Sequence, residues 1–261
     1  MTRKRRKPVE APTEELVMRY SHQLSELVSV LPRGMIDWQL DGGMAVAAHI
    51  GKFTRRHRDI DVGIFSVDLK AFEKRLHQCQ WALFSRNPIY GLEYTPVDLV
   101  RRTNACEVLS RDRVKRLTAF KVDARGRPVW DCERLIRFDV HVHEPRRETI
   151  LLTRNRIPFP NDLFFGSRAE RTLNGCDVPV ARAPFLYFFK LRRGSRRPRH
   201  LFDLRAMERQ GLVSDAEKKR LGLLLEMDEE AVSLRAFPPL RSLDWILEAF
   251  TQKTGTLPER S

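Results

Sequence analysis

A strand–glycine–helix–strand segment near the N-terminus constrains the fold of this 261-residue chain most strongly. MIDWQL (35–40) and IDVGIF (60–65) are short, mainly apolar runs that favour buried strands. Between them, MAVAAHI (44–50) is nearly all apolar and predicts a short helix, which Gly51 can end. The Asp-Gly-Gly sequence at 41–43 predicts a tight turn before that helix. The segment therefore predicts an α/β unit in which a glycine turn connects a strand to a helix.

Two aspartates lie at the start of the second strand. Because side chains alternate along a strand, Asp59 and Asp61 are expected to face the same way with Cα atoms roughly 7 Å apart, while Ile60 and Val62 face the core. Two unpaired carboxylates on one edge repel each other, and a divalent cation such as Mg²⁺ relieves that repulsion. The alternative is a solvated strand face with salt bridges to nearby arginines: Arg55, Arg56 and Arg58.

A third aspartate lies in the alternating segment IRFDVHVH (136–143). Its phenylalanine and valines are expected to face the core, which places Asp139 on the other face with Arg137, His141 and His143. Three carboxylates from two strands can hold one or two magnesium ions against a triphosphate, as in-line nucleotidyl transfer requires. Asp139 and the two histidines could instead bind zinc or iron, but such a site leaves the glycine turn without a role.

The two glycines of the turn suit a phosphate site. Without Cβ atoms, Gly42 and Gly43 allow the backbone to approach a phosphate closely. A helix that begins at Met44 would direct its free N–H groups toward the same phosphate. The turn and the carboxylates together predict a site for a nucleoside triphosphate and its metal.

The order of these motifs resembles the nucleotidyltransferase superfamily related to DNA polymerase β. The motifs are the glycine pair, TRRHRDIDV (54–62) and FDVHV (138–142), and they cover about residues 35–145. Within the superfamily, the chain is most similar to the aminoglycoside and lincosamide nucleotidyltransferases and their uncharacterised bacterial relatives. The resemblance implies an α/β nucleotidyltransferase fold with a mixed β-sheet, followed by a C-terminal helical domain.

The resemblance also implies roles for single residues. Gly42 and Gly43 would hold the nucleotide phosphates, and Asp59 and Asp61 would bind metal. Asp139 would be the third carboxylate, either as a ligand of a second metal ion or as the base toward the acceptor hydroxyl.

Further residues have alternative interpretations. His57 and Arg58 are candidates for phosphate contact, with a solvated loop as the alternative. Lys190 matches a lysine that such enzymes often keep near the nucleotide, or it is a lysine whose ammonium reaches water from an apolar helix. Relatives commonly have a Lys-Asp pair ahead of their last aspartate, whereas this chain has Arg-His at 199–200. Asp203 is therefore interpreted as a helix-packing salt bridge.

The chain is expected to have three parts. Residues 1–12 would form a basic disordered tail, residues 13–180 the nucleotidyltransferase catalytic domain, and residues 181–261 the helical domain. In the last part, Ser214 and Glu217 form a capping box ahead of an apolar helix.

The charge of the chain restricts its partners. The net charge is +14, and it is +9 when the five basic residues of the tail (Arg3, Lys4, Arg5, Arg6 and Lys7) are left out. Such a surface favours polyanionic partners and disfavours a polycationic aminoglycoside as the acceptor. A neutral small molecule, an RNA end or a protein hydroxyl is expected instead.

The location of the protein is expected to be the cytosol. No apolar run is long enough to span a membrane, and no apolar stretch follows the basic N-terminus as in a secretory signal. The four cysteines are scattered without a Cys-x-x-Cys pair, so neither a zinc knuckle nor a disulfide framework is indicated.

These observations predict an Mg²⁺-dependent nucleotidyltransferase. It would move a nucleoside monophosphate, expected to be AMP from ATP, to a hydroxyl of an acceptor and release pyrophosphate. Two alternatives use the same features: a catalytically inactive protein of this fold that binds nucleic acid, and a metal-dependent nuclease.

Overall fold

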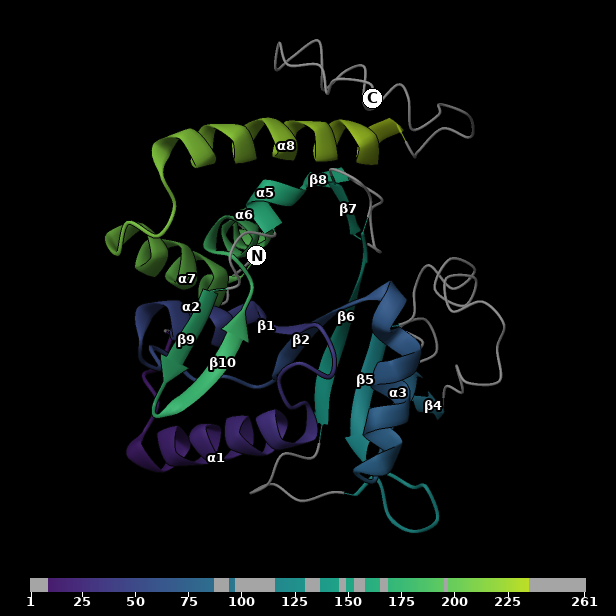
Figure 1. Cartoon of the computed structure of the whole chain (residues 1–261). Coiled ribbons are helices and arrows are strands. Elements are labelled where there is room, and N and C mark those ends of the chain that lie inside the picture. Colours follow the sequence, from purple (N-terminus) through teal and green to yellow (C-terminus); the bar gives the residue numbers. More distant parts are fainter. Residues whose placement is uncertain are drawn as a thin grey trace, which may run out of the picture.

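The computed structural model describes residues 9–86, 94–96, 116–129, 137–145, 149–152, 158–164, 169–194 and 197–234. Within these residues the strands join into one ten-stranded mixed sheet (Figure 1). Its strands are β1 (Trp38–Asp41), β2 (Asp61–Phe65), β3 (Trp81–Arg86), β4 (Tyr94–Pro96), β5 (Arg116–Lys121), β6 (Arg137–Pro145), β7 (Thr149–Leu152), β8 (Pro158–Pro160), β9 (Ala169–Leu173) and β10 (Cys176–Val180).

The helices are distributed along the whole chain. They are α1 (Glu14–Val30), α2 (Gly42–Ile50), the 3₁₀ helix η1 (Ser66–Asp68), α3 (Leu69–Gln78), α5 (Asn161–Phe164), α6 (Ala183–Gly194), α7 (Pro198–Arg209) and α8 (Asp215–Leu234). From α6 onward the described chain is helical, as predicted, and α6 packs against α7, α8 and α2. The predicted mixed α/β fold followed by helices is therefore confirmed.

The register of the central strands aligns the polar residues of the site. The strand order is β4-β3-β5-β6-β2-β1-β10-β9, with β7 and β8 continuing from β6. Asp61 on β2 lies opposite Asp41 on the antiparallel strand β1 and opposite Asp139 on the parallel strand β6. Thr118 on β5 lies opposite Asp139 from the other side. Four polar residues thus form one row across four adjacent strands.

The opposite face of these strands is part of the apolar core. Val62 and Ile64 of β2 are fully buried, as the alternation predicted, and so is Phe138 of β6. The ring of Phe138 contacts Phe72 of α3 and Trp81 of β3. Because every second side chain is buried on this apolar face, the side chains between them lie on the opposite, polar face, which carries the row of aspartates.

Local signals in the sequence have mixed outcomes. Thr13 caps α1 by accepting a hydrogen bond from Leu16 N at 3.4 Å. The predicted capping box also forms, because Ser214 N donates to Glu217 Oε2 at 2.8 Å and Glu217 N donates to Ser214 Oγ at 3.3 Å. Ser66, which the sequence suggests as the cap of the next helix, is instead the first residue of η1, and α3 begins at Leu69.

Some predictions fall outside the described residues. They include the first eight residues of the tail. VDLV (97–100), whose apolar residues predict a strand, and LRSLDWILEAF (240–250), whose apolar spacing predicts a last helix, also lie outside them. The described remainder of the tail includes Glu10, whose carboxylate lies 3.1 Å from Arg56 Nη1. Among the described helices, none is both long enough and apolar enough to cross a membrane.

Candidate active site

The strand β1 passes directly into α2 without the predicted turn. Asp41 is the last residue of the strand and the N-cap of the helix, which begins at Gly42 rather than at Met44. Gly42 has φ +69°, which L side chains rarely adopt, and a Cβ there would overlap the Asp61 carboxylate. The first glycine is therefore required because the chain must bend sharply where Asp61 approaches it.

The second glycine makes room for a different side chain. A Cβ on Gly43 would overlap Nη2 of Arg55 and lie 3.1 Å from Nδ1 of His57. The glycine pattern in the sequence indicated phosphate binding alone and gave no sign of these contacts. Phosphate binding by Gly42 and Gly43 remains a prediction.

The three predicted carboxylates converge. Asp59, Asp61 and Asp139 each offer an oxygen, and these oxygens lie within 4.8 Å of one another. Asp59 is exposed, and the other two are partly buried. Asp139 Oδ1 accepts a hydrogen bond from Thr118 Oγ1 at 3.0 Å, which fixes the carboxylate relative to β5. We call these three residues the carboxylate trio.

The negative charges of the three carboxylates repel one another, and a cation would offset this repulsion. Burial raises the pKa of Asp61, and although His141 counteracts this, the charges of Asp59 and Asp139 raise it further. Two of the arginines that could have neutralised the trio pair elsewhere: Arg55 with Asp203, and Arg56 with Glu10. The salt-bridged alternative is therefore wrong for these two arginines.

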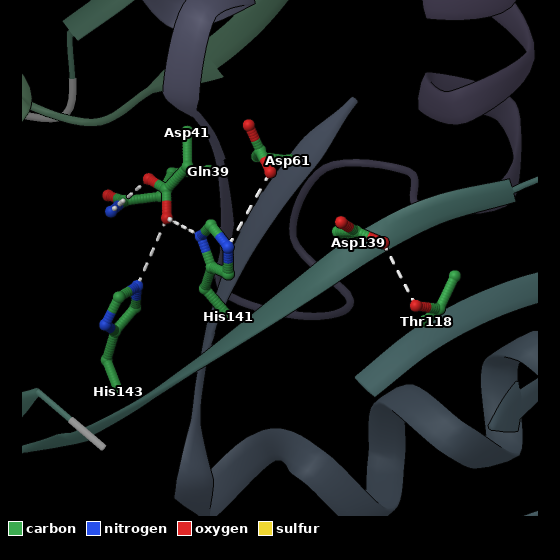
Figure 2. A network of polar contacts seen from close by, with 7 residues as sticks. All are labelled: Gln39, Asp41, Asp61, Thr118, Asp139, His141 and His143. Atoms are coloured by element: carbon green, nitrogen blue, oxygen red, sulfur yellow. Dashed lines mark hydrogen bonds and ion pairs between the residues drawn. The ribbon is translucent and has the colours of Figure 1, made fainter. Parts of the chain in front are cut away.

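A fourth aspartate, which sequence reasoning did not select, lies beside the trio. Asp41 is buried, with 2% of its surface exposed, and its Oδ2 lies 3.3 Å from both His141 Nδ1 and His143 Nε2 (Figure 2). Gln39 Nε2 donates to the other oxygen of Asp41 at 3.3 Å. A Cβ on Gly63 would lie 2.7 Å from Asp41 Oδ2, so this strand glycine makes room for the network. A glycine within a strand was the available signal for such a close approach.

The hydrogen bonds of this network shift the pKa values of Asp41 and His141 in opposite directions. Burial alone would raise the pKa of Asp41, but the hydrogen bonds from His141 and His143 lower it to about 2. Burial would likewise lower the pKa of His141, but the hydrogen bond to Asp41 and the charge of Asp61 raise it to about 9. The Nε2 atom of the His141 ring lies 3.6 Å from Asp61 Oδ1.

The position of His143 differs from the prediction. Alternation along β6 places it on the polar face as expected, but the side chain is buried rather than exposed. Helices α5 and α6 cover this end of the face, and their Phe164 and Phe185 contact the imidazole ring at centroid distances of 4.9 and 5.6 Å. The structure therefore does not favour the alternative zinc or iron site of Asp139 with both histidines, because His143 is enclosed by these rings, whereas the three carboxylates of the trio form a group that could hold a metal.

Lys190 belongs to a buried ionic cluster. Its Nζ lies 2.7 Å from Asp203 Oδ2, and Arg55 binds both oxygens of the same carboxylate at 2.7 and 2.9 Å. All three side chains are almost fully buried, so Lys190 does not extend into water at the helix end. Burial lowers the pKa of Lys190, while the two cations lower that of Asp203 against the effect of burial. The interpretation of Asp203 as a packing salt bridge agrees with this cluster, which joins α6 and α7 to the loop before β2.

The two basic residues before the trio have different environments. His57 is buried, its ring packs against Tyr20 and Phe53, and its backbone N–H donates to the Tyr20 hydroxyl at 3.0 Å. Burial first, and then the charge of Arg55, lowers the pKa of His57 to about 3. Arg58 is exposed next to Asp59. A solvated loop is thus wrong for His57, and phosphate contact by Arg58 remains a prediction.

Comparison with known proteins gives a family match over part of the chain. Residues 23–88 match the family described as aminoglycoside-2''-adenylyltransferase. An adenylyltransferase is a nucleotidyltransferase, so the match confirms the predicted resemblance over a range that includes Gly42, Gly43, Asp59 and Asp61. Asp139 lies outside it.

Two solved structures are similar to the chain. The crystal structure of ANT(2'')-Ia in complex with adenylyl-2''-tobramycin has 14% identity and a TM-score of 0.47, and the match covers 82% of this chain and 97% of that one. The solution structure of the antibiotic-resistance factor ANT(2'')-Ia has 13% identity and a TM-score of 0.49, and the match covers 84% of this chain and 94% of that one. Among curated proteins, none matches.

Proposed function

We propose that the protein is a metal-dependent nucleotidyltransferase that transfers AMP from ATP to a hydroxyl group of an acceptor. In this reaction the acceptor oxygen forms a bond to the α-phosphorus, the bond between the α-phosphorus and its bridging oxygen breaks, and pyrophosphate leaves. The observation that carries the proposal is the carboxylate trio, whose Asp61 lies beside Gly42 at the start of α2. The family match of residues 23–88 supports the same reaction class.

The trio fits a magnesium ion. Carboxylate oxygens are the ligands that Mg²⁺ prefers, and one oxygen from each of Asp59, Asp61 and Asp139 can meet at a single ion. A cation there would also offset the repulsion that raises the pKa of Asp61. When bound, Mg²⁺ would act as a Lewis acid on the phosphoryl oxygens.

Basic groups near the trio suit the phosphates. Asp41 is the N-cap of α2 but makes no side-chain hydrogen bond to the helix, because its carboxylate is held by Gln39 and the two histidines. The first N–H groups of α2 are thus not capped by that carboxylate and suit a phosphate. Arg55 and Lys190 share the one carboxylate of Asp203, so their cluster has a surplus positive charge. We expect Lys190 and Arg58 to contact the nucleotide.

Asp139 has two possible roles in this proposal. It completes the metal site, or it accepts the proton of the acceptor hydroxyl. The hydrogen bond from Thr118 leaves the second oxygen of Asp139 for either role.

Two observations support different kinds of acceptor for the AMP group. The net charge of +14 supports a neutral small molecule, an RNA end or a protein hydroxyl over a polycation. The name of the matching family supports an aminoglycoside. A panel of acceptors should therefore contain all four kinds.

Transfer of radiolabel from α-³²P-ATP to each acceptor tests the proposal. The variants Asp59→Asn and Asp61→Asn should lose turnover while remaining folded. Asp215→Asn is the matched control, because this aspartate is exposed on α8. Native transfer rates in both trio variants would refute the assignment. Degradation of RNA would favour the nuclease, and salt-sensitive RNA binding without ATP affinity would favour the inactive binding protein.

A further inference from the structure

We propose that His141 is a nitrogen ligand of the metal ion that Asp61 binds, and that Asp41 positions it. This inference deepens the metal-dependent function proposed above and depends on it. It would give the centre a mixed set of carboxylate and imidazole ligands.

The first support is the geometry of the His141 ring. Figure 2 shows the ring between Asp41 and Asp61, with Nδ1 at 3.3 Å from Asp41 Oδ2 and Nε2 at 3.6 Å from Asp61 Oδ1. A separation of 3.6 Å is too long for a hydrogen bond. Two ligand atoms on one ion, each about 2.1 Å from it, lie roughly 3 Å apart, so a small movement brings both into range. The His141 side chain is 49% exposed, so an ion can reach it.

The second support is the way Asp41 holds the ring. Histidines that bind metals almost always donate their other ring N–H to a carboxylate or carbonyl, which fixes the ring and directs the free nitrogen at the ion. Asp41 is placed to accept such a bond from Nδ1. Its carboxylate is itself buried and held by Gln39 and His143. A Cβ on Gly63 would lie 2.7 Å from that carboxylate, so the strand accommodates this arrangement.

The ligand set predicts a metal preference. Imidazole nitrogen favours later transition metals, whereas carboxylate oxygen suits magnesium and manganese. Replacing His141 by glutamine should therefore reduce the affinity for Co²⁺ more than the affinity for Mg²⁺. Isothermal titration with each metal alone measures this difference, and equal losses for the two metals would contradict it.

Pulsed electron paramagnetic resonance of the full chain loaded with Mn²⁺ tests the ligand directly. Without nucleotide, the wild-type spectrum should show ¹⁴N modulation from a coordinated imidazole, which changes when all histidines carry ¹⁵N. His141→Gln should remove it and lower Mn²⁺ affinity at least about tenfold, and Asp41→Asn should lower that affinity roughly 10- to 100-fold. His143→Gln is the matched control, because His143 also contacts Asp41 but should keep the ¹⁴N signal.

The outcomes separate the two proposals. Mn²⁺ binding without ¹⁴N modulation in the wild type overturns the role of His141 and leaves the carboxylate site intact. Absence of Mn²⁺ binding overturns both. The wild-type spectrum decides the question even if a variant fails to fold.

Discussion

Replacing Gly42 by alanine should damage the site through Asp61. Gly42 has φ +69°, and its missing Cβ leaves the space that the Asp61 carboxylate occupies. An L residue in this conformation costs roughly 1–2 kcal/mol. Overpacking against Asp61 adds about 1–3 kcal/mol. Gly42→Ala should therefore lower the free energy of unfolding by about 2–5 kcal/mol, and it should displace a carboxylate of the trio.

Gly51→Ala is the matched control at the other end of the same helix. Gly51 has φ +83°, but a Cβ at this position would have nothing within 4 Å of it. This variant should lower the free energy of unfolding only by the roughly 1–2 kcal/mol that an L residue costs at positive φ, and it should keep its activity. The difference between the two variants thus isolates the contact with Asp61.

Urea unfolding and label transfer from α-³²P-ATP measure the two effects. Because a misplacement of about 1 Å at a reacting centre can cost roughly 100-fold in rate, Gly42→Ala should lose activity on that order under conditions where it is folded. Equal unfolding free energies for the two variants, together with native turnover in Gly42→Ala, would refute the reasoning.

Three further predictions concern the side chains around the trio. Asp203→Asn should lower the free energy of unfolding by about 3–5 kcal/mol, because Arg55 and Lys190 stay buried without a counter-ion. The control Asp162→Asn breaks the more exposed pair with Arg220 and should cost about 1 kcal/mol or less in the same urea titration. Folding lowers the pKa of Asp203, so its ionised carboxylate contributes fully to stability above the unfolded pKa of about 3.9 and loses that contribution as pH falls from this value through the folded pKa. Acid unfolding followed by circular dichroism should therefore be steeper for the wild type than for Asp203→Asn. Thr118→Val should remove the hydrogen bond to Asp139 and lower kcat roughly 10- to 100-fold with little loss of stability, and an unchanged kcat would show that Thr118 does not position Asp139.

The local parts of the site could be predicted from the sequence. Alternation along β2 and β6 places Asp61 and Asp139 on the polar face, and adjacency of the two strands brings them together. Asp59 joins them from the loop before β2, so strand alternation does not account for its position. The prediction for Asp61 and Asp139 succeeded because side-chain alternation is a property of each strand and needs no knowledge of distant packing.

The missed features depend on segments far apart in the chain. His143 follows the alternation correctly, but its burial comes from Phe164 and Phe185 on helices that follow it. Arg55 pairs with Asp203, which lies 148 positions away in the chain, so its partner could not be assigned from its sequence neighbours. Gly42 and Gly43 were correctly selected as special, but which side chains fill the space beside them depends on the folded structure.

The central claim is that the trio holds the divalent cation through which ATP binds. Isothermal titration of ATP into the wild type and into Asp61→Asn, each with Mg²⁺ and with EDTA, tests it most directly. We expect binding to the wild type only with Mg²⁺ and at least about tenfold weaker binding to Asp61→Asn. Equal ATP affinity in all four titrations would contradict the claim.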